Sequence, residues 1–474
     1  MIPFFPLAVT RFSFPFRQQF LVLWLLLALP VLTFGQTAKY TISGFVRDKE
    51  TGENLIGVSI YNPASGQGTA TNAYGFYSLT LPQDSVTLVV SYVGYERLSY
   101  NTYLSSNREQ NFNLVASNKL KTVEIVGTRE EEIRESTRMS TISVPIAQIK
   151  TLPALFGEVD VLKTLQLLPG VQSGGEGSTG LYVRGGSPDQ NLILLDGTPV
   201  YNASHLFGFF SVFNPDAVQD VTFYRGAIPA QLGGRLSAIL DVRQKEGSYQ
   251  KFQGTGGIGI VTGRLALEGP IVKDKVSFLV AGRSTYSNWI FKRLPDAALR
   301  DDKASFYDGT VKLSALLSDK SKLVFSGYRS HDSFQFSADT VYSWETTNGS
   351  LSFNHIFSDN IILDVVGTTG VYDLNLDYKK PGSEAAYASG INHKGLKANL
   401  SVKRNKQQLN FGAATTYYKL NPGKLEPTSE ISGVNPKILN QDKAIESALY
   451  VNNDIAFSNR FSNTCRANLK TLIP

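Results

Sequence analysis

The four histidines are the first residues to test for chemistry, because histidine is the commonest metal ligand and a frequent acid–base catalyst. They are His205, His331, His355 and His393. None lies at the close paired spacing that zinc sites use. We therefore expect no metal site, and expect each histidine to lie at the surface or in the wall of a β-barrel.

Glycine-rich stretches are the second candidates, since such loops hold the phosphates of nucleotides. Residues 175–180 read GEGSTG and formally match G-x-G-x-x-G. The stretch follows a predicted helix and leads into a predicted strand, the reverse of the dinucleotide-binding order, and no Lys-Ser or Lys-Thr follows it. The Arg-Gly-Gly at 184–186 is a single copy between strands, unlike an RNA-binding box. We expect no cofactor.

Nucleophilic catalysis has no visible site either. The sequence contains neither G-x-S-x-G nor H-E-x-x-H, and its only cysteine, Cys465, lies in the C-terminal tail. A single cysteine also excludes an intrachain disulfide. We expect the protein not to be an enzyme.

Composition limits the remaining classes. Of the 474 residues, 42% are hydrophobic and 18% charged, so disorder over the whole length is excluded. The formal net charge is +6 without any long basic block, which argues against a nucleic-acid partner. The many glycines, tyrosines and phenylalanines favour strands and turns.

The first 35 residues have the pattern of an export signal. Arg11 and Arg17 precede an apolar run at 20–32, FLVLWLLLALPVL, and the residues TFG precede Gln36. The run is shorter than the ~18 apolar residues of a spanning helix. We expect cleavage of residues 1–35, and entry into a membrane, if any, as a closed β-barrel.

Residues 40–115 alternate short strands with turns, which predicts a small β-sandwich. Gly44, Val46, Gly57, Val58 and the stretches NAYGFYSL and SYVGYE resemble the carboxypeptidase regulatory-like domain. That resemblance implies a transthyretin-like sandwich at 38–116. In carboxypeptidases this fold accompanies a separate zinc catalytic domain, for which the histidines of this chain give no support.

Residues 119–136, KLKTVEIVGTREEEIRES, place a short β-prone stretch between polar and charge-rich flanks. It looks like an exposed strand without a hairpin partner. Such a strand can add to the sheet edge of another protein. Taken alone, the segment favours a solvated linker.

The region 140–246 mixes helix and strand. FGEVDVLKTLQLLPGV predicts one helix that ends at 169–170, because its apolar residues recur at near-helical spacing. LYVRGGSPDQNLILLDG predicts a hairpin: a strand, two permissive glycines, a turn, and a buried strand ending in a tight turn. GGRLSAILDV follows with two more glycines.

In this order, the three stretches resemble the plug domain of TonB-dependent outer-membrane receptors, of the Bacteroidetes type that carries a regulatory-like extension. The resemblance implies an α/β plug at 140–246 and a TonB box within 119–136. It assigns the TonB box to Thr122, Val123, Glu124, Ile125 and Val126, and structural plug-motif roles to Arg184, Gly185, Gly186, Asp196, Gly197, Gly233 and Gly234.

Residues 250–474 read as antiparallel strands with two-residue alternation. In GLKANLSVK, apolar Leu396 to Val402 alternate with polar Lys397 to Lys403. Short polar turns alternate with long connections at 293–303, 379–390 and 421–443. Tight turns at only one end favour a membrane barrel over a β-propeller or a row of sandwiches.

The barrel is expected to be partial. We count roughly ten strands, whereas a plugged outer-membrane transporter has about 22. In NTCRANLKTLIP, residues 463–474, the alternation is expected to dissolve, which suggests a truncated or frame-shifted end near 462–464. A small natural barrel of about ten strands is the alternative.

Together these observations predict a mainly β protein with a signal peptide, a β-sandwich, an α/β plug and the first part of a transmembrane antiparallel barrel. The resemblance implies active uptake of an iron chelate or siderophore, an oligosaccharide, a cobalamin-like molecule or a peptide across the bacterial outer membrane. Expected partners are TonB, outer-membrane lipid, the small ligand and a surface lipoprotein, but no nucleic acid. The alternative is a secreted or surface-attached β-sandwich adhesin or glycan-binding protein.

Overall fold

The computed structural model describes residues 38–117, 141–151, 158–175, 179–293, 295–296, 300–336, 339–404, 407–456 and 462–473. The expected signal peptide and residues 122–126 lie outside these ranges. Residues 40–474 belong to one compact unit, and every contact below lies within it. Among the described residues, no helix has the length and apolar character needed to cross a membrane.

The predicted N-terminal sandwich is confirmed. Ile42 and Val46 of one sheet, and Ile60 and Leu88 of the other, are fully buried in a common core. Gly44 is required by close approach, since a Cβ there would lie 2.1 Å from the carbonyl oxygen of Gln110. The first sheet comprises β1 (Lys39–Asp48), β4 (Phe76–Pro82), β7 (Arg108–Glu109) and β8 (Phe112–Leu114), and the second comprises β2 (Ser59–Tyr61), β3 (Gly68–Ala70), β5 (Asp84–Ser91) and β6 (Leu98–Leu104).

The next region, here called the α/β domain (described residues within 141–246), is built on a five-stranded mixed sheet of order β13-β12-β17-β16-β9. Its strands are β9 (Thr141–Pro145), β12 (Leu192–Leu195), β13 (Thr198–Pro199), β16 (Val218–Tyr224) and β17 (Ile239–Gln244). Around the sheet lie α3 (Ile146–Ile149), α4 (Val161–Gln166), β10 (Val171–Ser173), β11 (Leu181–Val183), β14 (Ser204–His205), β15 (Phe210–Ser211) and the 3-10 turns η1 (Pro188–Gln190), η2 (Leu206–Gly208) and η3 (Ala230–Leu232).

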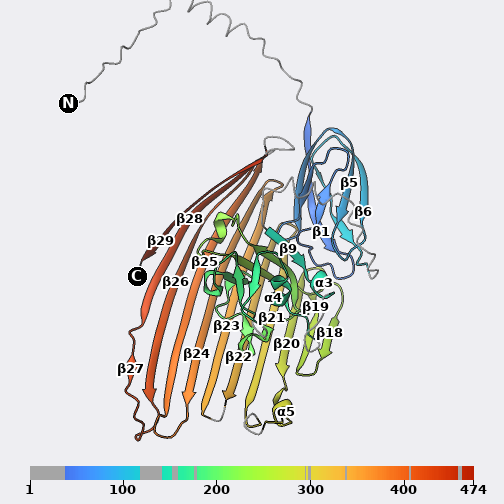
Figure 1. Cartoon of the computed structure of the whole chain (residues 1–474). Helices are drawn as coiled ribbons and strands as arrows, with labels where there is room; N and C mark the ends of the chain where they lie inside the picture. Colours follow the sequence, from blue (N-terminus) through green and yellow to red (C-terminus); the bar gives the residue numbers. More distant parts are fainter. Residues whose placement is uncertain are drawn as a thin grey trace, which may run out of the picture. The chain divides into compact units, whose positions relative to one another are not determined.

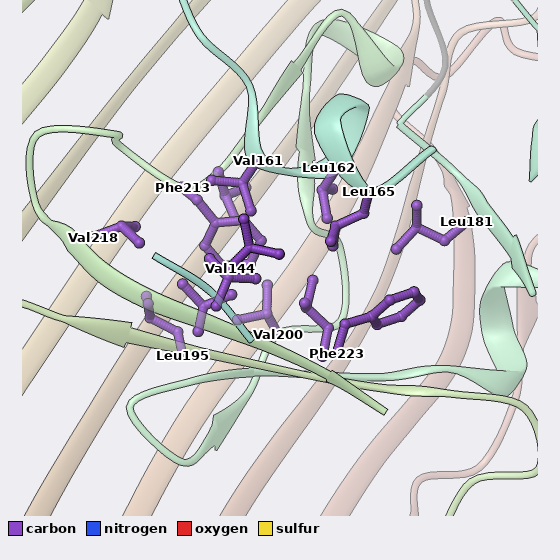
Figure 2. Close-up of a cluster of buried hydrophobic side chains, with 14 of the residues drawn as sticks. Val144, Val161, Leu162, Leu165, Leu181, Leu195, Val200, Phe213, Val218 and Phe223 are labelled. Atoms are coloured by element: carbon purple, nitrogen blue, oxygen red, sulfur yellow. The ribbon is translucent and has the colours of Figure 1, made fainter. Parts of the chain in front are cut away.

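The predicted helix of this domain is present as α4. Asp160 caps its N-terminus by accepting the Lys163 N–H at 2.9 Å. Its apolar face carries Val161, Leu162 and Leu165 into a core that also contains Phe223 (Figure 2). Burial of these side chains holds the short helix on the sheet, since a helix of this length is not stable alone.

The predicted hairpin at 181–197 is wrong. β11 pairs with β10, whereas β12 pairs with β13 and, in parallel, with β17. Arg184 and Gly185 adopt left-handed backbone angles (φ 49° and 85°), so the chain folds back on itself and Val183 bonds to Gly186 in both directions. The parallel partner of β12 comes much later in the chain and could not be inferred from local turn spacing.

The described residues from 253 onward form one 12-stranded antiparallel sheet, here called the long-stranded sheet, whose strands run from yellow-green to red in Figure 1. Along the sheet lie β18 (Gln253–Ile258), β19 (Thr262–Val272), β20 (Val276–Thr285), β21 (Lys303–Ser318), β22 (Ser321–Phe336), β23 (Thr340–Ser358), β24 (Ile361–Tyr378), β25 (Ala385–Arg404), β26 (Gln407–Pro427), β28 (Asp442–Ala456) and β29 (Ser462–Ile473); β27 (Lys437–Ile438) pairs with β26, and α5 (Asn288–Phe291) precedes β21.

The connections alternate in length as predicted, but two expected long loops are shorter. Strands β21 and β22 are joined at 319–320 and β23 and β24 at 359–360, whereas 286–302 and 428–441 join strands at the opposite end. The expected loops at 379–390 and 421–443 were too wide, because Ala385 already pairs with Pro427. The ladder continues through residues whose polarity had suggested a loop.

The prediction that alternation dissolves after residue 462 is also wrong. β29 pairs with β28 along its whole length, from Ala456↔Ser462 to Ile445↔Ile473. Arg466 and Asn468 lie on one face of the strand, and Cys465 and Ala467 on the other. The pattern was missed because small side chains, rather than large aliphatic ones, occupy these apolar positions.

Candidate functional site

The long-stranded sheet has its polar face buried and its apolar face exposed. On one face, Lys312 and Asp332 are 6% and 1% exposed, whereas Leu351, Leu449 and Leu469 on the other face are 50%, 62% and 71% exposed. A sheet in water shows the opposite arrangement. The exposed face is therefore suited to an apolar environment, and the polar face to contact with the α/β domain.

Arg283 of β20 is the centre of a buried charge network between the sheet and the α/β domain. Its Nε and Nη2 donate to Asp308 Oδ2 at 2.8 and 2.7 Å, and its Nη1 donates to Glu158. Nη2 also donates to the Ser211 carbonyl at 2.7 Å, and Thr262 Oγ1 donates to Glu158 at 2.8 Å. Buried charges are tolerated only when paired and hydrogen-bonded, so this network fixes the position of the domain.

His205 of β14 continues the network. Its Nε2 lies 3.1 Å from Asp308 Oδ2 and its Nδ1 lies 2.7 Å from Asp332 Oδ2, while its ring stacks on Phe306 at 4.1 Å. Burial alone would lower the pKa of His205, but hydrogen bonds and negative charge from the two aspartates outweigh it and raise the pKa above 6.5.

The expectation that every histidine lies at the surface or in a barrel wall is therefore wrong for His205, which is fully buried in the α/β domain. His331, His355 and His393 do lie on strands of the long-stranded sheet, β22, β23 and β25. Across the described residues, no group of three or more His, Cys, Asp or Glu side chains is arranged to hold a metal ion.

Asp196 forms a second connection between domain and sheet. Its Oδ1 accepts the Gln244 N–H at 3.1 Å and Lys312 Nζ at 3.0 Å, and its Oδ2 accepts Ser326 Oγ at 2.8 Å. Asp196 and Gly197 both have positive φ, 46° and 81°, which makes a tight turn. The carboxylate thus links the turn to the end of β17 and to two strands of the sheet.

Three other residues assigned to the plug motif are glycines at positions of close packing or unusual backbone conformation. A Cβ on Gly186 would lie 2.4 Å from Ser237 Oγ, and one on Gly233 would lie 2.7 Å from Asn468 Nδ2 of β29. Gly234 has a φ of 111°, a conformation that L side chains rarely adopt. Residues 122–126, assigned to the TonB box, lie outside the described residues.

Sequence reasoning missed the residues of the charge network. Glu158, His205, Arg283, Asp308 and Asp332 follow no known motif. One signal in the sequence could have indicated this network: charged residues occur on one face of strands predicted to cross a membrane. Burying such a charge in the membrane is energetically unfavourable unless it is paired, so partners were to be expected.

A cavity of about 220 Å³ lies between the α/β domain and the sheet. Among its lining residues are Asp241, Arg243, Lys312 and Lys397. The Asp241 Oδ1 atom is buried without a hydrogen-bond partner among the described residues. The interface thus combines firm ionic contacts with a polar space that water can enter.

Comparison with known families and structures agrees with this architecture. Residues 42–126 match the CarboxypepD_reg-like domain, and residues 134–238 match the TonB-dependent Receptor Plug Domain. The fold is similar to that of the siderophore receptor PirA from Pseudomonas aeruginosa, with 18% identity and a TM-score of 0.51 over 71% of this chain and 57% of that one.

Two further structures have the same fold. A mutant of the ferric enterobactin receptor PfeA from Pseudomonas aeruginosa has 15% identity and a TM-score of 0.54, covering 72% of this chain and 58% of that chain. The copper transporter OprC has 12% identity and a TM-score of 0.55, covering 70% and 55%. This chain thus spans less than two thirds of the length of each.

Proposed function

Since this chain carries the regulatory-like domain and the plug domain of TonB-dependent receptors, followed by strands with the fold of their barrels, we propose that it acts in TonB-dependent uptake of a small ligand across the bacterial outer membrane. It acts as a transporter and not as an enzyme. The α/β domain is the plug, and the long-stranded sheet belongs to the barrel.

One observation supports this proposal most directly: the sheet exposes leucines on one face and buries Arg283, Lys312 and Asp332 on the other. An exposed apolar band is stable when lipid covers it. A charged lumen filled by a folded domain blocks free diffusion, so passage of a ligand requires the domain to move. A secreted adhesin made of sandwiches would need neither feature.

TonB is the proposed source of that movement. In this proposal TonB captures residues 122–126 by strand addition, in which backbone hydrogen bonds supply affinity. Residues 1–35 direct export and are removed. A surface lipoprotein is the further partner in this proposal.

For the ligand we propose a ferric chelate first, because similar folds are those of a siderophore receptor and a ferric enterobactin receptor. Oligosaccharides, cobalamin-like molecules and peptides are to be tested as well, because structural similarity at such low sequence identity shows a shared fold and not a shared ligand.

The test uses the complete receptor that carries this chain, expressed in its host. Ile125→Pro should abolish accumulation of radiolabelled ferric chelate while leaving binding to whole cells nearly intact, because proline removes a backbone donor from the added strand. Ser136→Pro, outside the assigned box, is the matched control and should transport normally. Equal uptake by the Ile125→Pro variant and the parent would remove residues 122–126 from this role.

A further inference from the structure

The hairpin formed by β14, η2 and β15 has an unusual backbone. Leu206, Phe207 and Gly208 have successive positive φ angles of 49°, 56° and 114°. Two non-glycine residues in this region are unfavourable, and such a conformation persists only where the surroundings hold it. The contacts of this hairpin must therefore keep it in place.

Aromatic contacts hold the tip. The Phe207 ring lies 4.9 Å from Phe334, 5.1 Å from Trp344 and 5.6 Å from Tyr342, all in edge-to-face geometry. Phe207 is still 48% exposed, whereas Trp344 beneath it is only 4% exposed. The tip therefore covers Trp344.

Ionic contacts hold the base. His205 lies between Asp308 of β21 and Asp332 of β22, and the N–H of Leu206 donates to Asp332 Oδ1 at 3.1 Å. Both ring nitrogens of His205 thus face carboxylate oxygens. A neutral imidazole has a single N–H, so its other nitrogen would place a lone pair against the lone pair of a carboxylate oxygen. An imidazolium instead donates a hydrogen bond to each of the two carboxylates.

The charges around the ring also favour the imidazolium form of His205. Asp308, Asp332 and Glu158 face Arg283 and His205, and Tyr328 of β22 is buried close to the two aspartates. If His205 is neutral, Arg283 is the one cation beside the three carboxylates. If His205 is protonated, two cations balance them. A buried site strongly favours the more nearly balanced state.

We propose that His205, as an imidazolium, is the positioning residue that holds the strained hairpin against β21 and β22, and that loss of its proton releases the hairpin from the sheet. The proposal rests on the proposed function only in placing this hairpin in the domain that moves during uptake; the contact itself is a property of the resting protein.

The direction of the pH effect follows from the raised pKa of His205. A histidine whose pKa is raised in the bound state contributes its full stabilisation below about 6.5, its unperturbed pKa. That stabilisation is lost as the pH rises through the raised value. The hairpin should therefore be held below about pH 6.5 and released as the pH rises through the raised pKa of His205.

Trp344 provides the measurement. The sequence has three tryptophans, Trp24, Trp289 and Trp344, of which Trp24 lies in the expected signal peptide. In the complete receptor in which every tryptophan except Trp344 is replaced by phenylalanine, in detergent micelles, acrylamide quenching of Trp344 is followed from pH 6 upward while the far-ultraviolet circular dichroism stays constant. We expect weak quenching at pH 6 and a several-fold larger quenching constant once the pH has risen past the raised pKa of His205.

Two variants separate a proton-dependent role from a purely structural one. In Asp332→Asn, the amide oxygen can accept the Leu206 N–H and the amide nitrogen can donate to His205 Nδ1, so a neutral imidazole satisfies both contacts. This variant should remain weakly quenched at all pH values. His205→Gln should be quenched strongly at all pH values, and His355→Gln, a histidine at the short-turn end of β23, should behave as the parent does.

The proposal is overturned if Asp332→Asn follows the same pH profile as the parent, or if His205→Gln leaves Trp344 protected. The experiment needs neither TonB nor a ligand. A receptor that transports nothing would contradict the proposed function and leave the role of His205 standing, whereas a pH-independent parent would contradict only the latter.

Discussion

Replacement of Arg283 by methionine should detach the plug from the barrel strands. The side chain is 1% exposed and donates to two carboxylates and one carbonyl oxygen. Methionine fills similar space but leaves Glu158 buried without its cation and Asp308 with His205 as its remaining ionic partner. Removing one partner of a buried ion pair costs about 3–5 kcal/mol. At about 1.4 kcal/mol per factor of ten, the population of receptors with a detached plug should rise roughly 100- to 4,000-fold.

Limited proteolysis of the complete receptor measures this population, because cleavage follows the open fraction when opening and closing are fast. Arg329→Met is the matched control: this arginine also lies on a barrel strand, but it is 63% exposed and 3.6 Å from Glu345, so its loss should change cleavage little. Adding Glu158→Gln to Arg283→Met should restore part of the protection, since one unpaired charge is removed. If Arg283→Met is cleaved at the parental rate, the network does not hold the plug.

Two further substitutions test the packing and the exposed face. Gly186→Val should destabilise the plug by about 1–3 kcal/mol, because its Cβ would lie 2.4 Å from Ser237 Oγ; a melting temperature equal to that of the parent would show that Ser237 moves aside freely. Leu351→Arg places a charge on the exposed apolar face and should destabilise the protein folded in lipid vesicles by about 2–4 kcal/mol if this position lies near the bilayer midplane. An unchanged folding free energy would mean that lipid does not cover Leu351.

The order of the domains could be predicted from the sequence because local signals dominate there. Turn residues and alternation located the sandwich and the long strands, and the spacing of Leu162 and Leu165 located α4. Alternation failed where Cys465 and Ala467 occupied the apolar face, since small side chains give a weak signal.

The pairing of strands and the charge network could not be predicted in this way. β12 finds its parallel partner β17 across many intervening residues, and no local spacing encodes that choice. His205 and Asp332 are likewise brought together only by tertiary structure. For His205 the sequence offered a histidine without a motif, and only the presence of two aspartates at its two nitrogens gives it a role.

The position of β9 has a mechanical consequence. Among the described residues, β9 is the last strand of the plug sheet and has β16 as its one neighbour, with which its five residues pair from Thr141↔Tyr224 to Pro145↔Asp220. When tension on the preceding chain, where residues 122–126 lie, is directed across the strands, it reaches the Thr141–Tyr224 pair first and then each following pair. Hydrogen bonds that break one after another need less force than bonds that break together. Under load the plug therefore loses β9 before the inner strands of its sheet separate.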